Sequence, residues 1–499
     1  MKITPKTFLL VLLTLLAVVI IYLGVQSVRL KWWVSAETVQ LAELTPDQKA
    51  ADMRYLLDLT RQVSQADAVW QAAGLDNPLD QPEGWIERAR QTNSNSKFAD
   101  LVLQFLVHAG QGGHAFLAYD VQFNPTTSLV GDIPRDAFYK MPQWGQVISR
   151  LAWNAHADLQ VTYRDGQYVL GADKRLGDIT IPNGAVVETV DSLPADEFVL
   201  AQQYRAHLRY DPLFKKFFLY PLFSVDPGPA RPGWDIVFRL PDGAQQTVFV
   251  PKIPGYVSHR PDESSAANTR CLAINAHTLY LKILTFSGAH ADQDAATLRQ
   301  CFASGSFQKV IFDVRGNSGG EIWSYTDNII APLIREPLTY ETTDPPAHVA
   351  RVDEIAYPPY SDQGWRVVRV TRRVEPVAEP FPFDGQVYIL ADNNTLSAGD
   401  SFVAVMQRSG LAKVVGANTA GWGQSYQAKL PYALPNSGII FYLDSELTLN
   451  PDGTLNNYVG VVPDISLSAS TYPTPYPASL SLTTLLADEW VQWVLHDAP

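Results

Sequence analysis

A strand, a polar turn and a helix follow one another between Gln386 and Gln424, and this segment constrains the fold more than any other. The run Val387–Ala391 has the length and β-branched content of a strand, and apolar periodicity over residues 398–409 predicts a helix. Ser397 stands at the junction, where the amides of the first helical turn and the helix dipole favour an oxyanion. The segment therefore predicts either a nucleophilic serine or a simple helix N-cap.

A second strand-turn-helix unit lies upstream. The run Lys309–Val314 predicts a buried strand, Arg-Gly-Asn-Ser-Gly-Gly follows it, and a helix is expected over residues 321–333. Glycines after a strand let backbone amides approach a ligand closely. The string lacks the Lys-Ser/Thr ending of a phosphate-binding loop. We therefore expect an oxyanion hole formed by the amide of Ala398 and that of Gly319 or Gly320.

Six motifs lie along the chain around these two units. They are PNGAVVETVDSLPADEF (Pro182–Phe198), YLKILTF (Tyr280–Phe286), VIFDVRGNSGG (Val310–Gly320), TLSAGDSF (Thr395–Phe402), VVGANTAGWG (Val414–Gly423) and GVVPDI (Gly460–Ile465). Together they resemble the tail-specific, carboxyl-terminal processing serine proteases and their tricorn-like branch. The resemblance implies a crotonase-like β/α core of the α/β (α+β) class, a polypeptide substrate, and Ser397 as the nucleophile.

The general base departs from the main pattern of this family. The resemblance implies a lysine in a Gly-Lys-Gly string, but the matching residues here are Gly421, Trp422 and Gly423. The tricorn-like branch uses a histidine from an upstream segment instead, and the glycine-bounded segment around His114 is similar to it. Imidazole has a suitable pKa for accepting a hydroxyl proton near neutrality. We therefore expect His114 to be the base, with a hydrogen-bonded loop histidine as the alternative.

The residue that orients the base is the third expected member of the site. The resemblance places a glutamate three residues before the Gly-Val-x-Pro-Asp string, and this chain has Asn457 there. Asparagine can fix the tautomer of an imidazole but cannot balance an imidazolium by charge. Glu446 and Asp444, within a strand-like segment, are alternatives, and each can equally be a solvated strand carboxylate.

An uncharged apolar run, Phe8–Val25, predicts a membrane anchor. It has 18 residues, with lysines before it and Arg29, Lys31 and two tryptophans after it, as a transmembrane helix with interfacial anchors requires. A cleaved signal peptide is the alternative, but the nearest acceptable cleavage site lies beyond the positive charges. We expect a single-pass protein of the cell membrane whose bulk is extracytoplasmic, and periplasmic in a Gram-negative cell.

Composition and the two cysteines limit the chemistry further. The formal net charge is −13 and no basic tract occurs, so nucleic acid is not expected as a partner. Cys271 precedes a predicted strand and Cys301 ends a predicted helix that returns along it, so a disulfide bond is expected, with two unpaired buried thiols as the alternative. The spacing fits no zinc motif and no HExxH string occurs, so neither a metal site nor a cofactor is expected.

These features divide the chain into five regions. A β-rich stretch with two hairpin signals looks like a degenerate PDZ module, a fold that binds peptides at a sheet edge. The proline-rich segment 335–382 predicts a loop insertion. The expected regions are a cytoplasmic tail and anchor (1–30), an N-terminal helical cap with the first core segment (37–143), the degenerate PDZ-like β module (144–255), the crotonase-like catalytic core (256–475) and a C-terminal helix (476–499).

Two further functions remain open at this level. Loss of the lysine and the asparagine at position 457 are also expected of a catalytically impaired protein that binds peptides or other ligands. The same serine constellation attacks esters more easily than amides, which leaves an envelope esterase as a third possibility. The oligomeric state is left open.

Overall fold

A computed structural model provides the architecture of the chain. Among its described residues no helix combines the length and apolar character needed to cross a membrane. The predicted anchor Phe8–Val25 lies outside the described residues. Those residues are 41–64, 66–112, 114–118, 133–151, 155–226, 231–254, 267–343, 369–423, 430–443, 448–467, 471–472 and 480–497.

A six-stranded sheet forms the core of the C-terminal half. Its order is β14-β15-β16-β19-β20-β23, with β14 antiparallel to β15 and every other neighbouring pair parallel. The central strands are mostly apolar and buried because helices cover both faces, as parallel sheets require. The strands are β14 (Thr269–Asn275), β15 (Thr278–Ile283), β16 (Lys309–Asp313), β19 (Gln386–Ala391), β20 (Lys413–Gly416) and β23 (Ile465–Ser466).

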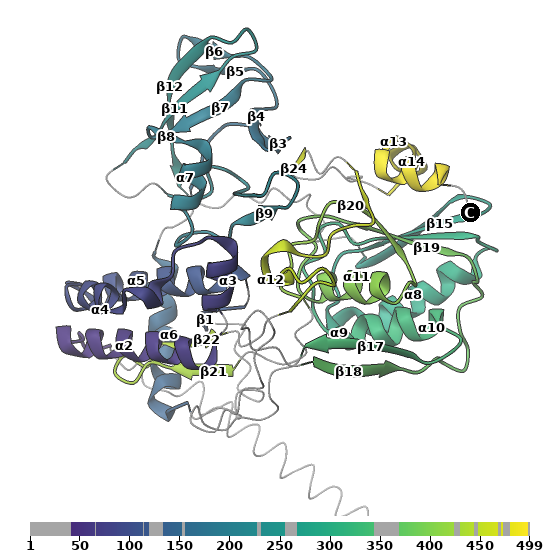
Figure 1. The fold of residues 1–499 in the computed structure, drawn as a ribbon, viewed down its shortest axis with the longest axis horizontal. Helices are drawn as coiled ribbons and strands as arrows, with labels where there is room; N and C mark the ends of the chain where they lie inside the picture. The colour runs from purple at the N-terminus through teal and green to yellow at the C-terminus, as the bar shows by residue number, and fades with distance from the viewer. Residues whose placement is uncertain are drawn as a thin grey trace, which may run out of the picture.

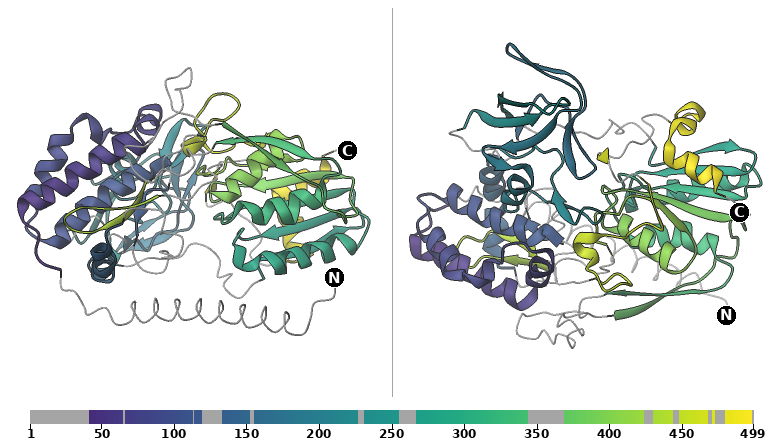
Figure 2. Two further views of the ribbon diagram at one scale, coloured as in Figure 1. Left: turned by 90° about the horizontal axis from the view of Figure 1, so that it is seen from below. Right: turned by 45° about the horizontal axis from the view of Figure 1, so that its top comes forward.

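Successive side chains of these strands enter two separate apolar layers. Leu281, Phe312 and Ile389 pack beneath α8 and α11, whereas Ile311 and Tyr388 pack beneath α13 and α14. Figures 1 and 2 show the two sets of helices on opposite faces of the sheet. The helices are α8 (Ala291–Ala303), α9 (Ile322–Tyr325), the π-helix η6 (Thr326–Ile330), α10 (Ala331–Leu333), α11 (Ala398–Arg408), α13 (Leu482–Ala487) and α14 (Glu489–His496).

The predicted disulfide bond joins edge strand β14 to helix α8. Cys271 and Cys301 are bonded, with their Cα atoms 6.2 Å apart and 30 positions apart in sequence. The helix returns antiparallel to the sheet and brings its end to the start of the strand hairpin. The alternative of two unpaired thiols is therefore wrong.

The N-terminal half is helical, and two strands from the C-terminal half of the chain pack with it. Strand β1 (Phe116–Leu117) pairs with β22 (Ile440–Leu443), which pairs with β21 (Leu430–Ala433). The buried carboxylate of Asp52 accepts hydrogen bonds from the backbone amides of Asn436 and Ser437, both at 2.8 Å. The helices are α2 (Pro46–Val63), α3 (Ala66–Ala73), α4 (Pro82–Arg90), α5 (Asn95–Ala109) and α6 (Arg135–Ser149).

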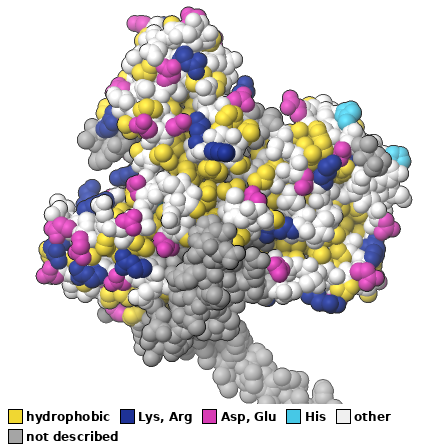
Figure 3. Space-filling model, in the orientation of Figure 1, with side chains coloured by type: hydrophobic (Ala, Val, Ile, Leu, Met, Phe, Trp, Pro, Cys, Tyr) yellow, Lys and Arg dark blue, Asp and Glu magenta, His cyan; other side chains and the backbone are white. Residues whose placement is uncertain are grey.

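A β-rich module lies at the top of Figure 1, and its buried apolar residues form one continuous core with those of the N-terminal helices. Its sheet has the order β12-β11-β7-β4-β3-β24, with β8 paired to β7 and helix α7 packed against β7. On the face in Figure 3, apolar side chains gather at the junction below the module and charged ones scatter outward. The elements are β3 (Val161–Arg164), β4 (Gln167–Leu170), β7 (Val186–Val190), β8 (Leu193–Pro194), α7 (Ala195–Ala201), β11 (Gly233–Arg239), β12 (Gln245–Pro251) and β24 (Thr471–Tyr472).

Smaller pairs of strands complete the module. A hairpin of β9 (Arg209–Asp211) and β10 (Lys216–Phe218) lies between the module and the core, in contact with α12 (Asn456–Val459). The remaining pairs are β5 (Lys174–Leu176) with β6 (Ile179–Ile181), and β2 (Ala155–His156) with β13 (Ile253–Pro254).

Three predicted elements differ from the structure. Helix α6 continues to Ser149, past the expected module boundary at residue 144. The segment predicted as a loop insertion contains an antiparallel pair, β17 (Leu338–Thr343) and β18 (Arg369–Val374). The single C-terminal helix is two helices, because Asp488 leaves helical geometry and caps α14 by accepting from the amides of its first turn.

Removing the disulfide bond tests its contribution to stability. We expect the double variant Cys271→Ala, Cys301→Ala to lower the free energy of unfolding by about 3–4 kcal/mol, because the open chain regains loop entropy in the unfolded state. Urea unfolding of oxidised protein, followed by tryptophan fluorescence, measures the change. The reduced unsubstituted protein should match the variant, and equal transition midpoints for the oxidised forms would show that the bond contributes nothing.

Candidate active site

Ser397 lies in the turn between β19 and α11 with a strained backbone. Its φ of 55° and ψ of −126° are rarely adopted by residues other than glycine. Its amide donates to the carbonyl of Gly421 (3.0 Å), and its own carbonyl accepts from the amide of Ser401 (2.9 Å). These bonds hold the strained turn, which leaves the side chain half-buried rather than capping the helix.

His114 meets this serine from a distant part of the chain. It follows the short 3-10 helix η2 (Gly110–Gly112), precedes β1, and is half-buried. Its Nε2 lies 3.2 Å from Oγ of Ser397, across 283 positions of sequence. The structure therefore brings together the two side chains singled out as nucleophile and base.

The glycine turn after β16 packs directly on the serine. An added Cβ at Gly319, whose φ is +92°, would lie 2.6 Å from Cβ of Ser397. The Gly319 carbonyl accepts from the amide of Phe286 (2.8 Å) and from Oγ1 of Thr285 (2.6 Å). Because a trans peptide directs its C=O and N–H oppositely, the amide of Gly320 points away from Phe286.

The other glycine amide of the predicted oxyanion hole is already engaged. The N–H of Gly319 donates to Oδ1 of Asn317 at 2.8 Å, and this asparagine is fully buried. The Asn317 carbonyl also accepts from the amide of Leu396 at 3.0 Å, which ties the glycine turn to the serine turn. Of the two glycines predicted for the oxyanion hole, Gly319 and Gly320, it is Gly320 whose N–H points away from these hydrogen bonds.

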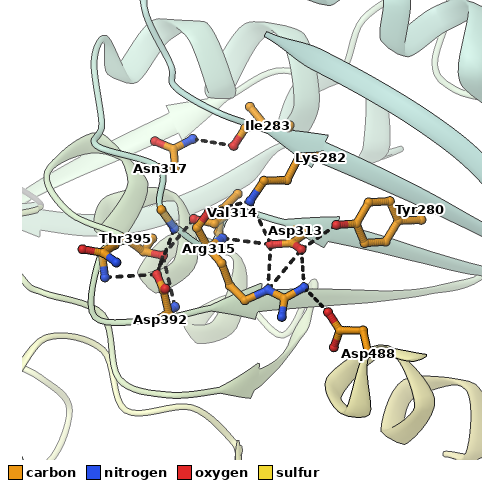
Figure 4. Close-up of polar contacts among 12 residues, drawn as sticks. Tyr280, Lys282, Ile283, Asp313, Val314, Arg315, Asn317, Asp392, Thr395 and Asp488 are labelled. Carbon is orange, nitrogen blue, oxygen red and sulfur yellow. Dashed lines mark hydrogen bonds and ion pairs between the residues drawn. The ribbon is translucent and has the colours of Figure 1, made fainter. Parts of the chain in front are cut away.

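A buried charge cluster fixes the start of the glycine turn (Figure 4). Oδ2 of Asp313 accepts from Arg315 and Tyr280, both at 2.5 Å, and Lys282 donates to the carbonyl of Arg315 at 2.5 Å. Asp488, at the start of α14, accepts from Arg315 at 2.7 Å. Burial alone would raise the pKa of the Asp313 carboxyl, but Arg315 and Lys282 beside it hold that pKa below its ordinary value.

Asp392 and Thr395 join the two turns behind the serine. Oδ1 of Asp392 accepts from the amide of Gly316 (2.9 Å) and from the amide of Asn394 (3.0 Å). Oγ1 of Thr395 donates to the carbonyl of Val314 at 2.8 Å (Figure 4). These hydrogen bonds fix the end of β16 relative to the end of β19.

Trp422 occupies the position at which the resemblance implies a lysine. Its ring makes an edge contact with His114 (centroids 5.8 Å apart) and another with His207 (5.0 Å), and the guanidinium of Arg209 lies 5.9 Å from its centroid. Burial, together with Arg209 and His114 nearby, lowers the pKa of His207 to about 4. A neutral His207 and the indole ring therefore pack beside His114, where a cationic lysine would otherwise stand.

A buried carboxylate on the serine helix anchors the loop that carries Trp422. Oδ1 of Asp400 accepts from Oγ1 of Thr419 and from Nδ2 of Asn456 (3.2 Å). Burial raises the pKa of this carboxyl to about 6 despite these hydrogen bonds. An added Cβ at Gly423 would collide with the other oxygen of Asp400, so the loop approaches the helix at a glycine.

Asn457 lies in α12, next to the same loop. The residue is buried, and its Oδ1 accepts from the backbone amide of Thr448 at 2.9 Å. Carbonyls of α12 pack against Gly421, which precedes Trp422. The alternatives Glu446 and Asp444 lie outside the described residues.

His108 has a structural role. Its Nε2 lies 2.7 Å from the carbonyl of Asp76, and its ring stacks on Trp70 with centroids 4.9 Å apart. Burial lowers the pKa of His108 to about 4. In the described part of the chain, no group of three or more histidine, cysteine, aspartate and glutamate side chains could hold a metal ion.

Sequence reasoning missed several residues that shape this site. Asp400 follows Ser397 by three positions, so a carboxylate on the inner face of an apolar helix was an available signal. The sequence identified Asn317 only as a turn residue. Its hydrogen bond from the Gly319 amide depends on the conformation of the turn, which the sequence does not specify. His207 lies in a stretch with no local motif.

The assembled groups can perform acyl transfer. A hydroxyl lies within hydrogen-bond distance of an imidazole, and the amide of Ala398 opens helix α11 directly after the serine. A glycine turn packs against the same serine. This combination suits attack on a carbonyl carbon.

Comparisons with known proteins find a peptidase family model and similar folds. The sequence model of peptidase family S41 matches residues 277–467. Mature CPAF has a similar structure, with a TM-score of 0.52, 15% identity, and coverage of 85% of this chain and 93% of that chain. CPAF complexed with lactacystin gives a TM-score of 0.51, 15% identity, and coverage of 85% and 94%. At these identities the likeness shows a shared fold.

A third similar structure is the photosystem II D1 C-terminal processing protease. It is 13% identical, with a TM-score of 0.39, and the match covers 86% of this chain and 95% of that chain. No curated protein sequence matches this chain.

Substitution of Gly319 tests the packing of the glycine turn on the serine. We expect Gly319→Ala to slow labelling of Ser397 by a fluorophosphonate at least about 100-fold, because the new methyl group displaces the serine or the turn. Gly410→Ala is the matched control, since Gly410 also has a positive φ (+68°) but nothing lies within 4 Å of its added Cβ. Equal labelling rates for the two variants would contradict the packing argument.

Proposed function

Because the chain carries a domain of peptidase family S41 over residues 277–467, we propose that it is a serine peptidase whose nucleophile is Ser397 and whose general base is His114. The observation that carries this proposal is the 3.2 Å separation between Oγ of Ser397 and Nε2 of His114. That distance suits proton transfer from the hydroxyl to the imidazole. The base precedes the S41 domain in sequence, so the N-terminal part of the chain completes the site.

The reaction proceeds through an acyl-enzyme. The Ser397 hydroxyl donates its proton to His114 as Oγ attacks the carbonyl carbon of a peptide bond, and the carbonyl oxygen becomes an oxyanion. His114 then returns the proton to the leaving amine as the C–N bond breaks. Water, deprotonated by His114, attacks the ester in the same manner and releases the acid and the free serine.

We assign the oxyanion hole to the amides of Ala398 and Gly320. The Ala398 amide follows the nucleophile at the start of α11, where the helix dipole adds to its effect. The Gly320 amide is supported by the bonds of Gly319, whose N–H is engaged by Asn317 and whose carbonyl is engaged by Phe286. One such amide contributes on the order of 3 kcal/mol of transition-state stabilisation.

Asn457 is the residue that we propose to orient His114, with Glu446 and Asp444 as the alternatives. Its support is position: α12 packs against Gly421, and Gly421 binds the amide of Ser397. A neutral amide fixes the imidazole tautomer without offsetting the charge of the imidazolium. The proposed enzyme is therefore slower than one with a carboxylate in this position.

A peptide-binding protein without hydrolytic activity is the second candidate. The observation that favours it is Trp422, which replaces the expected lysine with a ring that cannot accept a proton. The contact between His114 and Ser397 favours hydrolysis, because an imidazole fills the place of the missing base.

Substitution of the two proposed reacting residues separates these candidates. We expect Ser397→Ala to reduce kcat for hydrolysis of an unfolded protein by about 10⁴-fold or more, because no nucleophile remains. His114→Gln should reduce kcat by about 10²–10⁴-fold, the usual contribution of a general base. Ser306→Ala and His277→Gln, on exposed side chains, are the controls and should retain full activity.

Fluorophosphonate labelling provides the readout that does not depend on a substrate. Labelling of the unsubstituted chain should be lost in Ser397→Ala and retained in Ser306→Ala. The peptidase assignment would be contradicted by hydrolysis that persists in Ser397→Ala. It would also be contradicted by an unsubstituted chain that neither reacts with the fluorophosphonate nor cleaves the unfolded protein.

We also propose that Phe8–Val25 anchors the chain in the cell membrane with its bulk outside the cytoplasm. The support is the uncharged length of this run and its basic and aromatic flanks. The full chain should fractionate with membranes and resist an alkaline carbonate wash, whereas a chain starting at residue 41 should not. Recovery of the full chain in the soluble fraction, or of a mature chain cleaved after this run, would contradict the proposal.

A further inference from the structure

Two successive glycines carry the peptide unit on which the proposed oxyanion hole depends. Gly319 is buried with a φ of +92°, and Gly320 is exposed with a φ of +137°. Glycines on both sides of a peptide unit leave its rotation free of Cβ clashes. Because the unit is planar, a flip would put the Gly319 carbonyl oxygen where the Gly320 N–H now points. Hydrogen bonds from outside the turn therefore have to hold this unit in one orientation.

The Gly319 carbonyl has two donors, both from the segment that follows β15. The amide of Phe286 donates to it at 2.8 Å and Oγ1 of Thr285 at 2.6 Å, so two donors match the two lone pairs of the oxygen. The amide of Glu321 donates to the carbonyl of Phe286 at 2.9 Å, which makes Phe286 and Gly320 a parallel bridge. In such a bridge Gly320 directs its own N–H to the side opposite Phe286.

A single buried side chain holds the backbone of Thr285 in turn. Oδ1 of Asn268 accepts from the Thr285 amide at 3.1 Å, and Nδ2 of Asn268 donates to the Thr285 carbonyl at 2.9 Å. The same Nδ2 donates to Oδ2 of Asp294, on helix α8, at 2.6 Å. The position of the Thr285 hydroxyl is therefore set by the start of β14 and by α8, and not by the glycine turn that it binds.

We propose that Thr285 is a positioning residue for the reaction, whose hydroxyl holds the Gly319 carbonyl so that the N–H of Gly320 faces the oxyanion. The proposal rests on the proposed function, because it names the side chain that orients one donor of that oxyanion hole. One hydrogen bond leaves a carbonyl free to tilt about its donor, and a second donor fixes its direction. An oxyanion donor acts mainly on the transition state, so its misalignment lowers kcat and leaves KM nearly unchanged.

Substitution of Thr285 tests this role in the full-length chain. Thr285→Val removes the hydroxyl and keeps the shape, whereas Thr285→Ser keeps the hydroxyl. Thr297→Val is the matched control, because Oγ1 of Thr297 also donates to a backbone carbonyl, that of Gln293, at 2.8 Å. We expect Thr285→Val to lower kcat for hydrolysis of an unfolded protein at least about ten-fold, with KM within about two-fold of the parent. Thr285→Ser and Thr297→Val should stay within about three-fold of the parent kcat.

Two chemical probes separate the oxyanion hole from the nucleophile itself. A fluorophosphonate places a phosphoryl oxygen where the oxyanion forms, so its reaction with Ser397 should slow at least about ten-fold in Thr285→Val. Iodoacetamide forms no oxyanion, because the attacking sulfur simply displaces iodide. Its rate of reaction with Ser397→Cys, followed by mass spectrometry, should therefore be the same with and without Thr285→Val. The protein is kept oxidised, so that Cys271 and Cys301 stay bonded.

Four results in an active parent would overturn the role of Thr285 alone. They are an unchanged kcat in Thr285→Val, a rise in KM in place of the fall in kcat, an equal loss in Thr285→Ser, and slower alkylation of Ser397→Cys when Thr285→Val is added. Thr285→Ala, which also lacks the hydroxyl, takes the place of Thr285→Val if that variant does not unfold cooperatively in urea. A parent that neither hydrolyses protein nor reacts with the fluorophosphonate would overturn the proposed function, and this proposal with it.

Discussion

The buried pair of Asp313 and Arg315 is the interaction on which the rest of the site depends. Both side chains are completely buried, and removing one partner of such a pair typically costs about 3–5 kcal/mol because a buried charge remains. The pair is stable only because the remaining donors and acceptors are satisfied by Tyr280, Lys282 and Asp488. These contacts come from the neighbouring strand β15 and from α14 on one face of the sheet, so the direction of the glycine turn is set by these elements rather than by glycine flexibility.

The strained serine turn is the second constraint, and it depends on the first. A positive φ at a residue other than glycine costs on the order of 1–3 kcal/mol and persists only where its surroundings determine it. Asn317 holds Leu396 on one side of the serine, and Gly421 holds the Ser397 amide on the other. A shift of the glycine turn would therefore release the strain and turn the serine hydroxyl away from His114.

Local patterns predicted the parts of this site that lie close together in sequence. The strands and helices around Ser397 and the glycine turn follow apolar runs and glycines that any strand-turn-helix unit requires. The meeting of His114 with Ser397 spans 283 positions, and only the resemblance to a protease family indicated it. The engagement of the Gly319 amide depends on the orientation of one peptide plane, which composition does not specify. The strand that pairs with β3 has only two residues, Thr471 and Tyr472, and prolines follow it. Such a strand is too short for a periodic pattern to predict it.

Trp422 links the β module to the chemistry of the site. A lysine in its place would carry its own proton acceptor to the serine, and the N-terminal half would then be dispensable for proton transfer. The indole ring packs against His114 and His207 and beneath Arg209, so residues that lead into the β9–β10 hairpin support the residue beside the proposed base. Because Trp422 stands where the resemblance implies a lysine, the position of His114 depends on how the β module packs against the core.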